Sequence, residues 1–218
     1  MNRNVLKEVL KGLILRGFDG ESLVVMPKGF YMGRFSEEFG CNLSIIDPIG
    51  VESPLCSVRV FLGRKPHYTG WIEIYDVRDR VSVGGKSIYF TDSWLEDGLL
   101  NIFSKVVEPG EAMYIDYSYD RRTMIMLERG YPPICTRLGK KLFYLGFTWF
   151  KVWYFPEGFM EGGVKLQCEK PLDNEVRRRH MEWLRRESMD FISSSGVDDE
   201  IHLEAIEYAR ALLGLKYE

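Results

Sequence analysis

The stretch SWLEDGLLNIFSKVVEPGEAMYIDY, residues 93–117, contains the change of hydrophobic period that decides the fold class. Its apolar residues first recur at helical spacing, which together with a capping box at the start predicts a helix over Ser93–Val107. Pro109-Gly110 then ends the helix, and Glu111–Tyr117 has the composition of a strand. A helix followed by a strand of this kind indicates a sheet with helices on its faces.

Antiparallel strands are predicted on the N-terminal side of this helix. Cys56–Leu62 and Thr69–Val77 both alternate apolar and polar residues, and the short polar loop between them is typical of a hairpin. Gly84-Gly85 turns the chain into a third strand, Lys86–Phe90.

The N-terminal part is predicted to contain two short elements and long loops. An amphipathic helix is expected over Asn4–Leu15, because its apolar and charged residues alternate at helical spacing. Leu23–Met26 predicts a short strand that Pro27 stops. Gly29–Pro54 is rich in Gly, Pro and Ser and is interpreted as loops with short pieces of structure.

Helices and strands continue downstream of residue 117. Thr148–Phe155 is apolar on both faces apart from Lys151, which is typical of an interior strand. We expect it to form a parallel pair with Glu111–Tyr117 in mid-sheet, with a ligand crevice between the strand ends. The other predicted elements are helices over Arg121–Arg129, Thr136–Leu145, Asn174–Ile192 and Asp199–Leu213, and a short strand over Val164–Cys168.

These elements predict an α/β fold with a mixed sheet and additional N- and C-terminal helices. Residues 1–170 are expected to form the α/β domain, and residues 171–218 a helical appendage packed on it.

Composition and charge exclude several classes of protein. The chain has 218 residues, of which 45% are hydrophobic and 28% charged, so it can bury a core without a disulfide or metal. Its net charge of −3 argues against a nucleic-acid partner. No stretch has the length and apolarity of a membrane span or signal peptide, which predicts a cytoplasmic protein without a membrane partner.

Cysteine and histidine spacing does not indicate a metal site. The four cysteines are scattered, so we expect them to be reduced and mostly buried. His180 and His202 lie among charged residues of predicted helices and are interpreted as exposed. His67 lies in a hairpin turn and is a lesser candidate for a general base. The common phosphate-loop, dinucleotide-binding and nucleophile-elbow motifs are absent from the sequence.

One polar cluster lies between the predicted strand Glu111–Tyr117 and the helix that follows it. A helix start presents free N–H groups to an anion, and the arginines add donors, so the cluster is a candidate ligand site. The alternative is a capping Asp followed by two solvated arginines. The candidate residues are Asp116, Tyr117, Tyr119, Arg121 and Arg122.

A second polar cluster follows the apolar strand that ends at Phe155. Its carboxylates could act as a base or hold an amine, and its glycines allow close approach of the backbone to a ligand. The alternative is a glycine-rich turn with exposed carboxylates. The candidate residues are Glu157, Gly158, Glu161, Gly162, Gly163 and Lys165.

The block from about Cys56 to Phe155 resembles the core of the GNAT-like acetyltransferases in its order of antiparallel strands, helix, strand, helix and strand. Lys141–Phe147 is similar to the Gly-Phe turn before the last core strand of that superfamily, and Leu127–Tyr131 is a second match. The full chain also resembles an uncharacterised, mainly archaeal family classed as a domain of unknown function, at Gly130–Pro133, Trp153–Gly158 and Glu161–Leu166.

The acetyltransferase resemblance implies acyl transfer from acetyl-CoA to a small-molecule or peptide amine. Tyr117 or Tyr119 would donate a proton, and Glu157 or Glu161 would serve as base or amine anchor. A homodimer is among the assemblies expected.

Two departures from the superfamily pattern support an alternative function. Where the superfamily has a Gly-rich turn for the coenzyme A diphosphate, the sequence has Thr91–Glu96, with two acidic residues and no glycine. The frequent general-acid Tyr falls on Leu142 or Met126, which cannot donate a proton. Together with an aromatic content of 14%, this keeps open a non-catalytic ligand-binding or assembly protein that has kept the fold and lost coenzyme A binding.

Overall fold

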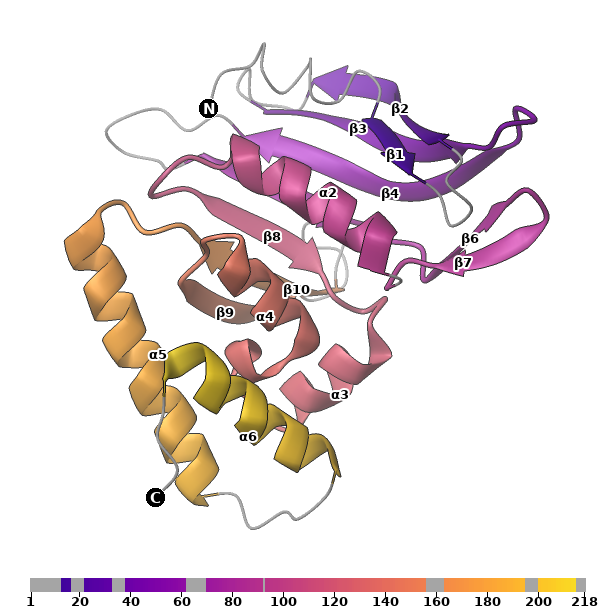
Figure 1. Ribbon diagram of the computed structural model, residues 1–218. Helices are drawn as coiled ribbons and strands as arrows, with labels where there is room; N and C mark the ends of the chain where they lie inside the picture. The colour runs from indigo at the N-terminus through magenta and orange to yellow at the C-terminus, as the bar shows by residue number, and fades with distance from the viewer. Residues whose placement is uncertain are drawn as a thin grey trace.

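One mixed sheet of eight strands runs through the part of the chain that the structure describes (Figure 1). The structure is a computed structural model and describes residues 13–16, 22–32, 38–61, 70–91, 93–155, 163–194 and 200–214. The strands are β1 (Leu13–Arg16), β2 (Ser22–Met32), β3 (Glu38–Ile46), β4 (Glu52–Phe61), β5 (Trp71–Tyr75), β8 (Ala112–Asp116), β9 (Trp149–Phe155) and β10 (Gly163–Glu169). Their order in the sheet is β1-β2-β3-β4-β5-β8-β10-β9.

Helices pack against this sheet, and a separate hairpin extends from it (Figure 1). The hairpin consists of β6 (Arg80–Val83) and β7 (Lys86–Tyr89). The helices are α2 (Ser93–Val106), α3 (Arg121–Glu128), the 3-10 turn η1 (Pro133–Cys135), α4 (Arg137–Tyr144), α5 (Asn174–Ser194) and α6 (Glu200–Leu213). None of the helices described is long and apolar enough to cross a bilayer.

The capping residues expected from the sequence begin α3 and α4. The side chain of Asp120 accepts a hydrogen bond from the N–H of Thr123, and that of Thr136 accepts one from the N–H of Gly139. The antiparallel pairing of β4 with β5 confirms the predicted hairpin, and all five helices predicted from Ser93 onward are present.

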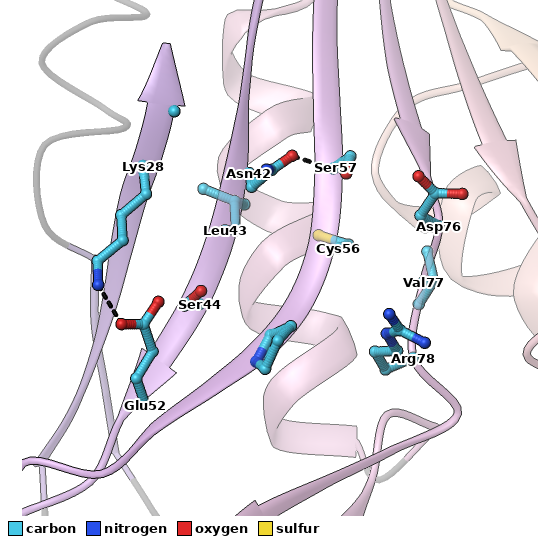
Figure 2. A pocket seen from close by; sticks show the side chains of 12 residues that line it. Lys28, Asn42, Leu43, Ser44, Glu52, Cys56, Ser57, Asp76, Val77 and Arg78 are labelled. Carbon is cyan, nitrogen blue, oxygen red and sulfur yellow. Dashed lines mark hydrogen bonds and ion pairs between the residues drawn. The ribbon is translucent and has the colours of Figure 1, made fainter.

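The N-terminal part is richer in strands than the sequence predicted. The sequence predicts loops with short pieces of structure over residues 29–54, yet this region contains the end of β2, all of β3 and the start of β4. Pro27 does not stop β2, because pairing with β3 continues past it and shifts register between Lys28 and Tyr31. In β3 the buried Leu43 alternates with the exposed Asn42, so the period-two signal exists but is short (Figure 2).

The predicted helix over Asn4–Leu15 is wrong at its C-terminal end. Leu13–Arg16 is a strand paired antiparallel with β2, so tertiary pairing overrides a local helical pattern. Residues 4–12 lie outside the described part of the chain.

The expected parallel pairing of Glu111–Tyr117 with Thr148–Phe155 is also wrong. β8 pairs in parallel with β5 and antiparallel with β10, and β10 separates β8 from β9. β9 is therefore an edge strand, and it is apolar on both faces because Phe150 packs into the core while Trp153 is half-buried on the other side. The helix α2 supplies the crossover that a parallel β5–β8 pair needs.

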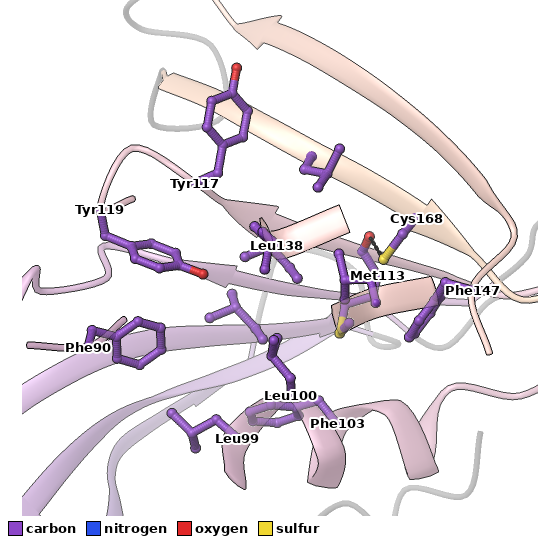
Figure 3. Packing of buried hydrophobic residues seen from close by; sticks show 14 of the residues in the cluster. Phe90, Leu99, Leu100, Phe103, Met113, Tyr117, Tyr119, Leu138, Phe147 and Cys168 are labelled. Carbon is purple, nitrogen blue, oxygen red and sulfur yellow. Dashed lines mark hydrogen bonds between the residues drawn. The ribbon is translucent and has the colours of Figure 1, made fainter. Parts of the chain in front are cut away.

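The hydrophobic core lies between the sheet and the helices (Figure 3). Leu99 and Phe103 of α2 pack in the same cluster as Met113 of β8. Leu184 of α5 and Leu213 of α6 belong to this cluster too, so the C-terminal helices share the core. All four cysteines are free and buried, as the sequence predicted.

A buried ionic network joins α2, α3 and α4. Glu96 of α2 is fully buried, accepts a hydrogen bond from the hydroxyl of Tyr119 at 2.7 Å and pairs with Lys141 at 2.7 Å. Arg137 of α4 bonds both to Glu96 Oε1 at 3.0 Å and to Asp120 Oδ2 at 2.6 Å. A carboxylate buried this deeply is tolerated only when it is paired in this way.

Removing the guanidinium from this network should be strongly destabilising. We expect Arg137→Met to lower the free energy of unfolding by about 3 kcal/mol, because Glu96 and Asp120 stay buried with too few partners. The matched control is Arg178→Met on α5, whose exposed pair with Glu182 contributes less than about 0.5 kcal/mol. Urea unfolding measures both, and equal losses for the two variants would contradict the role given to the network.

Candidate functional site

The face of the sheet opposite the hydrophobic core carries buried charged side chains from neighbouring strands. Strand register puts Arg59 of β4 beside Glu73 of β5, and Glu73 beside Tyr114 of β8. Tyr114 in turn lies beside Gln167 of β10, two residues from Lys165. Glu73 and Lys165 are each only 3% exposed, which is rare for charged residues and requires compensation.

Glu73 is the centre of this charged cluster. Its Oε1 accepts a hydrogen bond from Lys165 Nζ, and its Oε2 lies 3.6 Å from the guanidinium of Arg59. Arg59 also pairs with Glu38 of β3 at 3.4 Å. The Oε2 atom itself is buried and has no hydrogen-bond partner. One acceptor in the middle of the cluster is therefore left for a donor.

Aromatic rings surround the charges. The ring of Tyr75 lies 5.1 Å from the Arg59 guanidinium and 5.3 Å from Lys165 Nζ, which favours both cations. Trp71 stands edge-on to Tyr114, with ring centroids 5.9 Å apart. Burial, with smaller contributions from Glu169 and Glu73, raises the pKa of the Tyr114 hydroxyl to about 12, so it stays protonated near neutral pH.

A row of polar side chains extends the cluster along β10. Trp153 Nε1 donates to Gln167 Oε1, and Gln167 Nε2 donates to Glu169 Oε1 at 2.5 Å. Burial raises the pKa of Glu169, and the hydrogen bond from Gln167 opposes that rise.

The pairing between the two central parallel strands ends directly beside this cluster. The recorded β5–β8 pairing ends at Ile74 and Ile115. One residue later each strand keeps only its outer neighbour, because Tyr75 pairs with Ser57 of β4 and Asp116 pairs with Lys165 of β10. The carboxyl ends of parallel strands that separate in this way are a usual place for a ligand in a mixed sheet.

The first predicted polar cluster is split by the structure. Asp116 accepts bonds from the N–H and hydroxyl of Ser118 at 3.0 and 2.6 Å. Tyr117 is 1% exposed, and burial and a bond with Tyr154 raise its pKa. Tyr119 belongs to the Glu96 network, where burial raises its pKa. Arg121 and Arg122 are exposed, and Arg122 pairs with Glu204.

Only part of the second predicted cluster is described. Lys165 lies in the charged cluster as the partner of Glu73, and Gly163 is the first residue of β10. Glu157, Gly158, Glu161 and Gly162 lie outside the described residues.

Neither of the two histidines that the structure describes is exposed as expected. His202 is 4% exposed rather than on the surface, because its Nδ1 lies 3.3 Å from the hydroxyl of Tyr131 and its ring packs against Phe191. His180 is half-buried with Nδ1 3.0 Å from the hydroxyl of Thr148, and burial lowers its pKa. His67 lies outside the described residues.

Sequence reasoning missed Glu73 and Arg59. The signal was present, because each is a charged residue in the middle of a strand whose flanking residues on the same face are largely apolar or aromatic. Within the described ranges no group of three His, Cys, Asp or Glu side chains could hold a metal ion. The cluster thus offers acid–base and hydrogen-bonding groups.

Comparison with known proteins gives a family and a related structure. The family model described as "Protein of unknown function (DUF1122)" matches residues 21–195. The crystal structure of a protein of unknown function, AQ1966, from Aquifex aeolicus VF5 is 32% identical, with a TM-score of 0.76 over 96% of each chain. No curated protein matches the chain.

A double-mutant cycle tests the coupling of Glu73 and Lys165. We expect Lys165→Met alone to destabilise the fold by about 3 kcal/mol, because Glu73 is left with one distant cation. Glu73→Gln combined with Lys165→Met should cost clearly less than the sum of the two single changes. Urea unfolding gives the four free energies, and additive effects would show that the two side chains are not coupled.

The shift at Glu169 predicts a pH dependence. Because its pKa is raised in the folded protein, its contribution to stability is present below about pH 4.5 and is lost as the pH rises through the folded pKa. Glu169→Gln should therefore gain stability relative to wild type between pH 4 and 7. Urea unfolding at both pH values measures this, with the exposed Glu175→Gln as control. A variant that loses relative stability over this range would contradict the shift.

Proposed function

The chain belongs to the family described as "Protein of unknown function (DUF1122)". We propose that the protein is a GNAT-like acyltransferase that moves an acyl group from a thioester to an amine. The thioester enters where β5 and β8 part, and the amine is held at Glu73.

The order of elements supports this proposal. Antiparallel strands β2 to β5 and the β6–β7 hairpin are followed by α2, β8, the helices α3 and α4, and β9. This is the order for which the sequence resembles the GNAT-like core. The crevice is relocated from the predicted β8–β9 pair to the β5–β8 pair, because the latter is parallel and central.

The unpartnered Oε2 of Glu73 is the observation that carries the proposal. A buried carboxylate oxygen without a donor costs roughly 1–3 kcal/mol, and the N–H of a bound amine would satisfy it. Lys165 and Arg59 are the cations that pair with the Glu73 carboxylate, and its Oε2 is the oxygen offered to the amine N–H. Glu73 thus takes the role of base that the resemblance gives to Glu157 or Glu161.

The proposed reaction uses Glu73 as the base and Tyr117 as the acid, one from each face of the sheet. The amine nitrogen attacks the thioester carbonyl carbon, a C–N bond forms, the C–S bond breaks, and the nitrogen proton passes to Glu73. The departing thiolate takes a proton from Tyr117, whose raised pKa keeps the hydroxyl protonated, and solvent resets both groups. Tyr117 is preferred to Tyr119, because Tyr117 directly follows β8, whereas the hydroxyl of Tyr119 donates to the buried Glu96 of the helix network.

The start of α2 bears on the identity of the donor. Its first turn contains the buried Glu96, which Arg137 and Lys141 already neutralise. A second anion is not favoured there, so acetyl-CoA would be held by its pantetheine arm and thioester rather than by its diphosphate. This same observation favours the alternative function, a binding protein that keeps the fold without using coenzyme A.

Thiol release tests the proposal. We expect the protein to release thiol from acetyl-CoA or from the acetyl thioester of N-acetylcysteamine when a panel of primary amines is present. Glu73→Gln should lower kcat by about 10²-fold or more, since it removes the base and keeps the shape. Glu73→Gln alone leaves the buried Lys165 ammonium without its partner. The double variant Glu73→Gln, Lys165→Met removes both charges and should be equally inactive. Inactivity of the double variant therefore reflects loss of the base rather than misfolding caused by an unpaired buried charge.

The exposed Glu175→Gln on α5 is the control and should retain full activity. No thiol release above the uncatalysed rate from either donor would overturn the acyltransferase proposal in favour of the binding protein. Full activity of Glu73→Gln would overturn the role of Glu73.

A further inference from the structure

A groove of about 650 Å³ lies at the C-terminal end of β5, and its lining residues are distinct from those of the charged cluster (Figure 2). We propose that it binds a small zwitterion, an amino acid or short peptide with a free ammonium and a free carboxylate. The groove has the volume of a typical small-molecule site. The side chains that matter are Lys28, Asn42, Glu52, Ser57, Asp76 and Arg78.

Among the described residues, the charged side chains are paired with each other on one side of the groove and unpaired on the other. On one side Lys28 of β2 and Glu52 of β4 form an ion pair across β3, so their charges cancel. On the other side Asp76 and Arg78 follow β5, and within the described part of the chain no hydrogen bond or ion pair engages either side chain. One free anion and one free cation, separated by Val77, thus face the same groove.

The backbone at Asp76 is held in a strained conformation. Its φ of 50° is the one positive value among the described residues other than glycine. Such a conformation costs free energy and persists where the surroundings hold it. The next turn of the chain is fixed by the hydrogen bond from Arg78 N–H to Leu55 O at 2.9 Å. The fold therefore holds both charged residues at the edge of the groove.

Neutral polar groups form the floor between the charges. Ser57 Oγ donates to Asn42 Oδ1 at 3.0 Å, which leaves the Asn42 amide nitrogen to donate to a ligand. Beneath them Leu43 and Cys56 are buried and close the bottom of the groove. A ligand on this floor meets hydrogen-bonding groups rather than a large apolar surface.

These features fit an ammonium and a carboxylate on one small molecule. The planar guanidinium of Arg78 can bind a carboxylate through two parallel hydrogen bonds. The Asp76 carboxylate is the complementary acceptor for an ammonium. A ligand with only one of these charges would leave the other charged residue without a partner. The proposal does not require acyl transfer, although the groove begins next to Tyr75 of the charged cluster.

Binding without any acyl donor tests the inference. The probes are the free amino acids and their glycyl dipeptides, each compared with its N-acetylated and its C-amidated form by calorimetry. At least one parent compound should bind with a Kd of about 1 mM or tighter, and both of its blocked forms roughly tenfold weaker.

Two variants assign the two charges. Asp76→Asn should weaken the parent compound roughly tenfold but leave the N-acetylated form unchanged, and Asn tolerates the positive φ. Arg78→Gln should weaken the parent but leave the C-amidated form unchanged. The exposed Asp79→Asn, outside the groove, is the control. Failure of every probe to bind at about 10 mM, or wild-type binding by both variants, would overturn the inference. Neither result depends on thiol release, so the acyltransferase proposal stands or falls separately.

Discussion

The parallel pairing of β5 with β8 is the constraint on which the arrangement of this protein depends. All other pairings between described neighbouring strands are antiparallel, and α2 supplies the crossover that this parallel pair requires. Past Ile74 and Ile115 the two strands follow different outer neighbours. The charged cluster and the groove both lie near that point, because residues 73 to 78 of one short segment contribute to each.

The two faces of the sheet show two ways of burying charge. On the helix side, Glu96 is fully buried and both of its carboxylate oxygens accept hydrogen bonds, so the network holds α2, α3 and α4 in place. On the opposite side, Glu73 is just as deeply surrounded, yet one of its oxygens has no donor. A fully satisfied cluster is typical of structure, whereas an incomplete one is where a substrate can bind.

The sequence predicted the elements that carry strong local signals and misplaced those set by distant pairing. The helix over Ser93–Val107 and the caps at Asp120 and Thr136 depend on neighbours in the chain, and the structure contains them. The neighbours of β8 could not be read from periodicity, because the apolar pattern of β9 is also compatible with an edge strand that packs on both sides. Lys165 was found as a candidate from its position near a turn, but its partner Glu73 becomes evident only when the strands are aligned.

The most direct test of the central claim is a map of where a thioester binds. Backbone amide chemical shifts measured by NMR during titration with S-acetylpantetheine should change most at Tyr75, Asp76, Asp116 and Tyr117, which end the two parting strands. Changes confined to residues remote from these strand ends, or no changes at all at saturating thioester, would contradict the account.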